Sequence, residues 1–349
     1  MDNNTCEGMV EVGVLRYTII TLVFFIGVAG NIAALWILYR SARTRNKKHV
    51  LMLRCLAVND LVAEVGMFTV ITLQKYELVP IYWRCVGFVL LRAFGLGSGC
   101  VAFVMALERW VALTRPFYYQ QLVTYRMIKI FIFSLWCGGA LLTYLPLFGF
   151  GLYYKGEPDD HHDGKCCRYR DATELSDKIY AYIFFIFGTA LCFCIAFCNL
   201  TVIWELSKIR SNDRVLVRRV SRSTMNSRIA AAKCQTPEEI AFAKLMAVIC
   251  IIFVVCWAPQ MISIPLAQFW KNSTFDKVFA KMANFLMCTY FTLDPYVYVL
   301  QRYIEKKKIV LRCCCPRRYK GSIPTSSVTA GTPTSVLLHP PSFTSLSVM

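Results

Sequence analysis

Four charged side chains stand inside long runs of otherwise apolar residues. Asp60 and Glu64 share one run, Arg92 interrupts a second and Asp294 a third. If these runs cross a bilayer, each charge near the midplane costs about 2.5–3.5 kcal/mol. Such a residue either holds two helices together through a hydrogen bond or has a functional role. For any one of the four taken alone, both explanations stay open.

The runs themselves predict membrane-spanning helices. A spanning helix needs about 20 apolar residues to cross roughly 30 Å of hydrocarbon, and its backbone groups must bond within the segment. The chain is 56% hydrophobic and 17% charged, and seven segments are long enough. They are residues 17–39, 55–74, 85–107, 130–152, 179–204, 245–270 and 282–301. The predicted fold is an all-α membrane protein, a seven-transmembrane helix bundle.

The placement of positive charge predicts the orientation. The net charge is +18, and more than half of the 39 Lys and Arg residues follow the first span, separate spans five and six, or follow the last span. These segments lie on one side of an alternating topology, which the positive-inside rule makes cytoplasmic. The N-terminus is therefore predicted outside a plasma membrane. The basic runs suit anionic lipid rather than nucleic acid.

One membrane domain is predicted. Residues 1–15 form an extracellular tail, 16–301 the bundle, 302–312 a short amphipathic helix on the inner leaflet, and 313–349 a disordered cytoplasmic tail. The tail is rich in hydroxyls that kinases can phosphorylate. It begins with a predicted palmitoylation site, Cys313, Cys314 and Cys315.

Other predicted modifications lie outside the membrane. Sequons place glycosylation at Asn3 and Asn272. Disulfides are expected among the cysteines on this side because that compartment is oxidising. These are Cys6, Cys85, Cys166 and Cys167.

No catalytic constellation is visible, and no cofactor or structural metal is predicted. The four histidines are assigned to loops and the tail: His49, His161, His162 and His339. The chain is therefore predicted not to be an enzyme. A seven-span transporter or channel is the alternative from another class. It predicts ion flux through the chain alone, and the absence of an internal repeat weakens it.

Six short motifs occur in order along these spans. They are Gly30-Asn31, Leu56-Ala57-Val58-Asn59-Asp60, Glu108-Arg109-Trp110, Trp136, Cys256-Trp257-Ala258-Pro259 and Asp294-Pro295-Tyr296-Val297-Tyr298. Together they resemble the rhodopsin-like G-protein-coupled receptors over nearly the whole chain. The resemblance implies a receptor that activates a heterotrimeric G protein.

The resemblance also implies an activation switch inside the bundle. Asn31, Asp60 and Asp294 would converge in a hydrated polar cluster able to hold a sodium ion, and Tyr298 belongs to the same switch. Pro259 would act as a hinge in span six, because it removes one backbone hydrogen bond. Trp257 stands just before this hinge, where a ligand could press on it.

A lock between two helices is expected at the cytoplasmic end. Glu239 precedes Pro259 by 20 residues, which is roughly 30 Å along a helix and the depth of Arg109. An ion pair between Arg109 and Glu239 would hold spans three and six together, and its release would admit the G protein. Alternatively, Glu239 only offsets nearby cations such as Lys244.

Several stretches are similar to the prostanoid receptors. They are residues 105–117, 197–200, 239–240 and 293–302. The similarity implies a prostaglandin-like lipid ligand, although Phe285 stands where that branch usually carries a carboxylate-binding Arg. It also implies a bridge from Cys85 to Cys167, or to its neighbour Cys166, with Cys6 either bonded to the remaining one or free.

A fatty-acid ligand would need another cation. Arg92 is the preferred anchor, because its guanidinium can hold a carboxylate through two parallel hydrogen bonds. Lys281 lies nearer the mouth, one turn from Phe285. The alternative for Arg92 is an internal ion pair with Glu64. A peptide or another small ligand is the alternative for the receptor as a whole.

Overall fold

The computed structural model describes residues 14–40, 46–156, 164–168, 171–219, 237–269 and 274–314. Helices make up most of this part of the chain. They are α1 (Val14–Arg40), α2 (Lys47–Lys75), α3 (Ile81–Thr114), α4 (Pro116–Leu122), α5 (Tyr125–Tyr144), α6 (Leu175–Arg219), α8 (Pro237–Phe269) and α9 (Thr274–Cys314). A short 3₁₀ helix, η2 (Leu145–Phe148), follows α5, and the strands β1 (Tyr154–Lys155) and β2 (Lys165–Cys166) form a small hairpin.

Six of the described helices are long and apolar enough to cross a bilayer. The spans lie in α1, α2, α3, α5 with η2, α6 and α8. The segment 282–301 lies in α9 and is less apolar, because Asn284, Asp294 and several tyrosines interrupt it. Residues Met1–Glu305 form one compact unit, and Lys306–Met349 form a second, of which 306–314 are described as helix.

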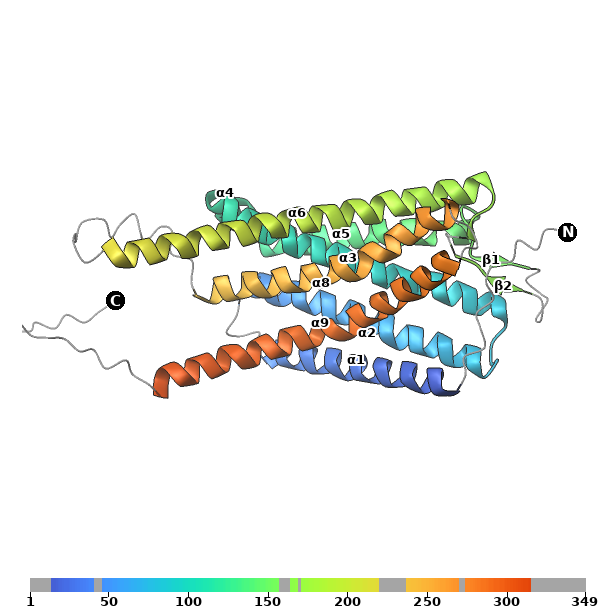
Figure 1. Cartoon of the computed structure of the whole chain (residues 1–349), viewed down its shortest axis with the longest axis horizontal. Coiled ribbons are helices and arrows are strands. Elements are labelled where there is room, and N and C mark those ends of the chain that lie inside the picture. The colour runs from blue at the N-terminus through green and yellow to red at the C-terminus, as the bar shows by residue number, and fades with distance from the viewer. Residues whose placement is uncertain are drawn as a thin grey trace, which may run out of the picture. The chain divides into compact units, whose positions relative to one another are not determined.

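Helix α3 is the centre of the first unit. It packs against α2, α5, α6 and α8, and α1 packs on α2 (Figure 1). Small residues such as Gly97 and Gly99 let neighbouring side chains approach α3 closely. Helix α9 joins α1 through a hydrogen bond of 2.9 Å from Tyr296 Oη to the carbonyl of Ile26.

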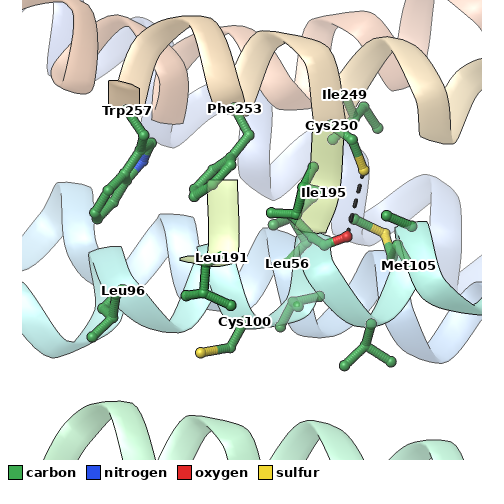
Figure 2. Close-up of a cluster of buried hydrophobic side chains, with 14 of the residues drawn as sticks. Leu56, Leu96, Cys100, Met105, Leu191, Ile195, Ile249, Cys250, Phe253 and Trp257 are labelled. Carbon is green, nitrogen blue, oxygen red and sulfur yellow. Dashed lines mark hydrogen bonds between the residues drawn. The ribbon is translucent and has the colours of Figure 1, made fainter. Parts of the chain in front are cut away.

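The core between α3 and α8 is a column of apolar side chains. From α8, Trp257, Phe253 and Cys250 point towards α3 (Figure 2). The Trp257 and Phe253 rings stack with centroids 5.2 Å apart. Cys250 Sγ donates to the carbonyl of Ala102 at 3.5 Å. A displacement of the Trp257 side chain would therefore be transmitted along this packed column, because close-packed interiors transmit displacement.

Several helix boundaries differ from the predicted spans. Helix α2 begins eight residues earlier than predicted, at Lys47, because Asn46 caps its N-terminus by accepting from Lys48 N at 3.1 Å. His49 therefore lies in a helix, and its assignment to a loop was wrong. Helix α6 continues past the predicted span to Arg219. Residues 302–312 are helical, as predicted, and belong to the continuous helix α9.

Candidate functional site

A cavity of about 380 Å³ opens at the hairpin end of the bundle, the end that carries β1 and β2. This volume falls within the usual range for small-molecule sites, about 300–1,000 Å³. Most of the lining is apolar, and Trp257 stands at its base, only 3% exposed. The column in Figure 2 begins at this tryptophan. Trp257 therefore belongs both to the cavity wall and to the buried core.

Cations outnumber acids among the lining residues. The cations are Arg92, Arg168, Lys277 and Lys281, and the acids are Glu64 and Asp171. Arg92 is half-buried with its Nη1 atom fully buried, whereas the other three cations are exposed. A positive, low-dielectric cavity attracts an anionic group. Of the four, Arg92 is the cation placed deepest in the wall.

Two of these cations were missed by sequence reasoning. Arg168 directly follows the cysteine pair of the second outside loop, and its Nη1 donates to Asn284 Oδ1 at 3.0 Å. Lys277 lies one helical turn before Lys281 on α9. The signal for Arg168 was its position beside a bridged loop expected to cover the cavity. Lys277 could have been found from the i, i+4 spacing.

Tyr153 adds a neutral hydroxyl to the same wall. It donates to Tyr82 Oη at 3.2 Å. Burial, together with the contact to Tyr82, raises the pKa of Tyr153 to about 12. The phenol therefore stays protonated and contributes no negative charge to the cavity.

Glu64 does not pair with Arg92 in the described part of the chain. Its carboxylate accepts hydrogen bonds of 3.2 Å from Asn31 Nδ2 and from Thr292 Oγ1. Glu64 is 1% exposed, so these bonds compensate part of the cost of burying its carboxyl group. The alternative explanation of Arg92, an ion pair with Glu64, is therefore not realised in this structure.

Phe285 lies away from the cavity. Its side chain is 65% exposed and is not among the lining residues. Phe285, which stands where the prostanoid branch usually carries its carboxylate-binding Arg, therefore does not line this cavity. The reason is the helical period: Lys281 and Asn284 present their side chains to the cavity, and Phe285 falls on the next, outward-facing position of α9.

The polar residues of the predicted switch meet deeper in the bundle. Asn31, Asp60, Asp294 and Tyr298 line a small cavity of about 20 Å³. Ser98 Oγ donates to Asp60 Oδ1 at 2.6 Å. Carboxylate and hydroxyl oxygens are ligands that hard cations prefer. The volume of this small cavity is enough for about one water or ion. No described group of three or more His, Cys, Asp or Glu could hold a metal ion, so a sodium site here stays a prediction.

The hairpin is tied to α3 by a disulfide between Cys85 and Cys166, with Cα atoms 5.2 Å apart. The predicted bridge from Cys85 to Cys167 is therefore wrong, and the alternative partner Cys166 is the one used. Tyr154 pairs with Cys166 across the hairpin. Because side chains alternate along a strand, only one of two adjacent cysteines can face α3. Cys167 is disulfide-bonded as well.

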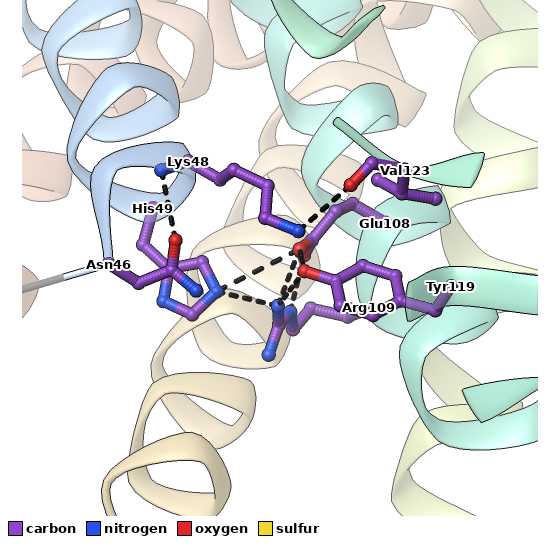
Figure 3. Close-up of polar contacts among 7 residues, drawn as sticks. All are labelled: Asn46, Lys48, His49, Glu108, Arg109, Tyr119 and Val123. Carbon is purple, nitrogen blue, oxygen red and sulfur yellow. Dashed lines mark hydrogen bonds and ion pairs between the residues drawn. The ribbon is translucent and has the colours of Figure 1, made fainter. Parts of the chain in front are cut away.

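Arg109 lies at the opposite end of α3 from Cys85, about 36 Å away at 1.5 Å per residue. Its Nε donates to Glu108 Oε2 at 2.5 Å, and its Nη2 donates to Glu108 Oε1 at 2.6 Å. Tyr119 Oη also donates to Glu108 (Figure 3). The Glu108–Arg109 pair is buried, with both residues at most 5% exposed. Such a pair needs these extra bonds to offset its desolvation.

The remaining predicted residues are placed as follows. Glu239 lies in α8, but its side chain is outside the described part of the structure, as are the side chains of Cys313 and Cys314 at the end of α9. Asn3, Asn272, Cys6 and Cys315 lie outside the described residues. Pro259 lies in the interior of α8.

The helical membrane bundle has a ligand-sized cavity at one end, a buried arginine at the other and a packed column between them. This arrangement defines a membrane receptor rather than an enzyme. The chain belongs to the rhodopsin family of seven-transmembrane receptors, because the family described as "7 transmembrane receptor (rhodopsin family)" matches residues 30–298. The fold is thus a seven-transmembrane bundle, with α9 supplying the seventh span.

Individual relatives are distant. The chain is 24% identical over 318 residues to "Rhodopsin, GQ-coupled" of Mizuhopecten yessoensis, covering 88% of this chain and 62% of that protein. It is 27% identical over 330 residues to "Prostaglandin E2 receptor EP3 subtype" of Homo sapiens, covering 87% and 80%. It is also 27% identical over 345 residues to "Prostacyclin receptor" of Mus musculus, covering 93% and 77%. Squid rhodopsin has the same fold, with a TM-score of 0.65, 20% identity and 86% of each chain covered.

Proposed function

We propose that this receptor binds a small acidic lipid of the prostaglandin type and activates a heterotrimeric G protein. The observation that carries the proposal is the apolar cavity with Arg92 in its wall and an excess of cations around it. The likeness to prostaglandin E2 and prostacyclin receptors supports the same ligand class. The hairpin end would face outside at the plasma membrane, and receptor kinases and arrestin would act on the cytoplasmic tail.

The proposed mechanism begins at Arg92. A carboxylate held by its guanidinium places the apolar chain of the ligand over Trp257. Displacement of that ring shifts Phe253 and the α8 side of the packed column, and Pro259 provides the hinge. The G protein enters when α8 leaves α3 at the Arg109 end. Only a ligand that binds the open state more tightly can produce this shift.

The anchor is tested by replacing Arg92 with alanine. The variant should reach the cell surface, and an acidic prostaglandin such as prostaglandin E2 should lose at least tenfold in potency, about 1.4 kcal/mol. Potency falls because the two charge-assisted hydrogen bonds between the guanidinium and the ligand carboxylate disappear. Potency is measured from cAMP and calcium responses at matched surface expression.

Two controls make this test specific. Lys281→Ala removes an exposed cation from the same cavity and should cost less than about threefold, because solvent screens it. The methyl ester of the ligand should mimic Arg92→Ala on the unmodified receptor and add little to the mutant. Equal potency of ester and acid on the unmodified receptor would show that no carboxylate anchor exists.

A second prediction concerns Glu239, which we propose as a closed-state partner of Arg109. Glu239→Ala should raise basal signalling about threefold or more, because only the closed state loses a contact. Lys244→Ala is the control, since Lys244 is exposed on the same helix. Unchanged basal cAMP and calcium in Glu239→Ala at matched expression would mean that Glu239 merely offsets neighbouring cations.

A further inference from the structure

A buried histidine touches the arginine of the proposed switch. His49 of α2 is 7% exposed, and its Nε2 lies 2.6 Å from Arg109 Nη2 (Figure 3). The same nitrogen lies 3.8 Å from Glu108 Oε1. The predicted lock joins α3 to α8 alone, so this contact brings a third helix to the arginine.

The chemistry of the contact determines the protonation state of the ring. A guanidinium has only donors and stays protonated in proteins. His49 Nε2 must therefore accept the hydrogen bond from Arg109, which requires a neutral ring with its proton on Nδ1. A protonated ring would have no acceptor and would place two cations 2.6 Å apart. The contact seen here exists only while His49 is neutral.

The His49 ring also holds α8 against this end of the bundle. It stacks on Phe242 of α8 with centroids 3.7 Å apart and an interplanar angle of 10°. The guanidinium of Arg109 lies over the same Phe242 ring, 5.0 Å from its centroid. Phe242 is 3% exposed. The three side chains thus join α2, α3 and α8 at the place where α8 must move for the G protein to enter.

The other charged groups around His49 are few in the described residues. Glu108 from α3 faces it, and Tyr119 from α4 bonds Glu108. Lys48, its neighbour on α2, points instead to the carbonyl of Val123, which it reaches at 2.9 Å, and its Nζ lies over the Tyr119 ring. From α8 the facing group is Phe242, whereas Lys244 is exposed.

We propose that His49 is a positioning residue of the activation switch, which in its neutral form holds Arg109 and Phe242 in the closed arrangement. Protonation of His49 replaces an accepted hydrogen bond by repulsion from Arg109 and draws the ring towards Glu108. Acidification on the cytoplasmic side therefore favours the open receptor and raises its basal activity. The link to signalling rests on the proposed G-protein function, whereas the movement of α8 does not.

The experiment uses the full-length receptor in membranes and two readouts between about pH 6 and 8, where histidine titrates. The first is an environment-sensitive fluorophore on Lys244→Cys, read against the same receptor without that cysteine. The second is basal binding of a slowly hydrolysed GTP analogue by added G protein. In the labelled receptor, fluorescence should change as the pH falls, and GTP-analogue binding should rise threefold or more.

Three variants separate positioning from folding. His49→Gln keeps an acceptor for Arg109 but cannot titrate, so both pH responses should disappear while activity at about pH 8 stays low. His49→Ala loses the contact at every pH, so its basal activity at about pH 8 should exceed that of the unmodified receptor and should not change as the pH falls. Phe242→Leu keeps apolar bulk but removes the ring stack, so its basal activity should rise while its pH response remains.

The outcomes are distinct. The same pH response in His49→Gln as in the unmodified receptor would overturn the proposal and point to Glu108 as the titrating group. A pH-independent label in the receptor that carries Lys244→Cys alone would also overturn it. A label response that vanishes in His49→Gln supports the role of His49. If no GTP-analogue binding accompanies that response, the proposed G-protein function fails while the positioning role stands.

Discussion

Arg109→Ala is expected to reduce the maximal G-protein response at least tenfold while the receptor still reaches the cell surface. In the proposed mechanism, α8 leaves α3 at the Arg109 end, and Arg109 becomes available to the G protein. Alanine removes the cationic side chain that lies over Phe242 of α8. The response is measured as maximal GTP-analogue binding with saturating ligand, at matched surface expression.

Two variants control for charge and for folding. Arg115→Ala removes an exposed cation six residues later and should leave the response within about twofold. Removing Arg109 also takes the cationic partner from the buried Glu108, which is costly in other proteins, about 3–5 kcal/mol. If expression falls, Arg109→Ala combined with Glu108→Gln should restore it without restoring signalling. Full signalling by either Arg109 variant would exclude the proposed role.

Cys166→Ser is expected to have the second large effect, a loss of at least tenfold in high-affinity ligand binding at the cell surface. The Cys85–Cys166 bridge joins residues 81 apart in sequence. In the chain-entropy model a loop of this length corresponds to about 4.5 kcal/mol. The bilayer makes this an upper value, because it already restricts the unfolded chain. Without the bridge, the hairpin no longer stays over the cavity. Binding of a radiolabelled prostaglandin to intact cells measures the loss.

Cys167→Ser is the matched control for this prediction. It changes the adjacent residue and should reduce binding less, because the bridge to α3 remains. Mass spectrometry of non-reduced peptides should recover Cys85 joined to Cys166. We expect Cys6 to be the partner of Cys167, since it is the remaining cysteine predicted outside. Recovery of a Cys85–Cys167 peptide, or a greater loss in Cys167→Ser than in Cys166→Ser, would contradict the structure.

The sequence alone determined the fold, since lipid imposes a local requirement. A span must be long, apolar and helical wherever it lies, so runs such as 17–39 and 245–270 could be recognised without knowing their neighbours. The ordered motifs from Gly30-Asn31 to Asp294-Pro295 were sufficient to indicate the family. Two residues on the inward face of one helix could also be placed, Trp257 from the resemblance and Arg92 from its position within its span.

Tertiary structure decided which side chains meet across helices. His49 seemed to lie in a loop, yet the capped start of α2 and the packing of α8 bury it against Arg109. The sequence allowed an ion pair between Glu64 and Arg92, but Asn31 and Thr292 from two other helices donate hydrogen bonds to Glu64. The choice between Cys166 and Cys167 depended on which way a strand presents its alternating side chains. Each of these contacts joins residues far apart in sequence, and its geometry depends on helix packing and strand register, which no local pattern of residues encodes.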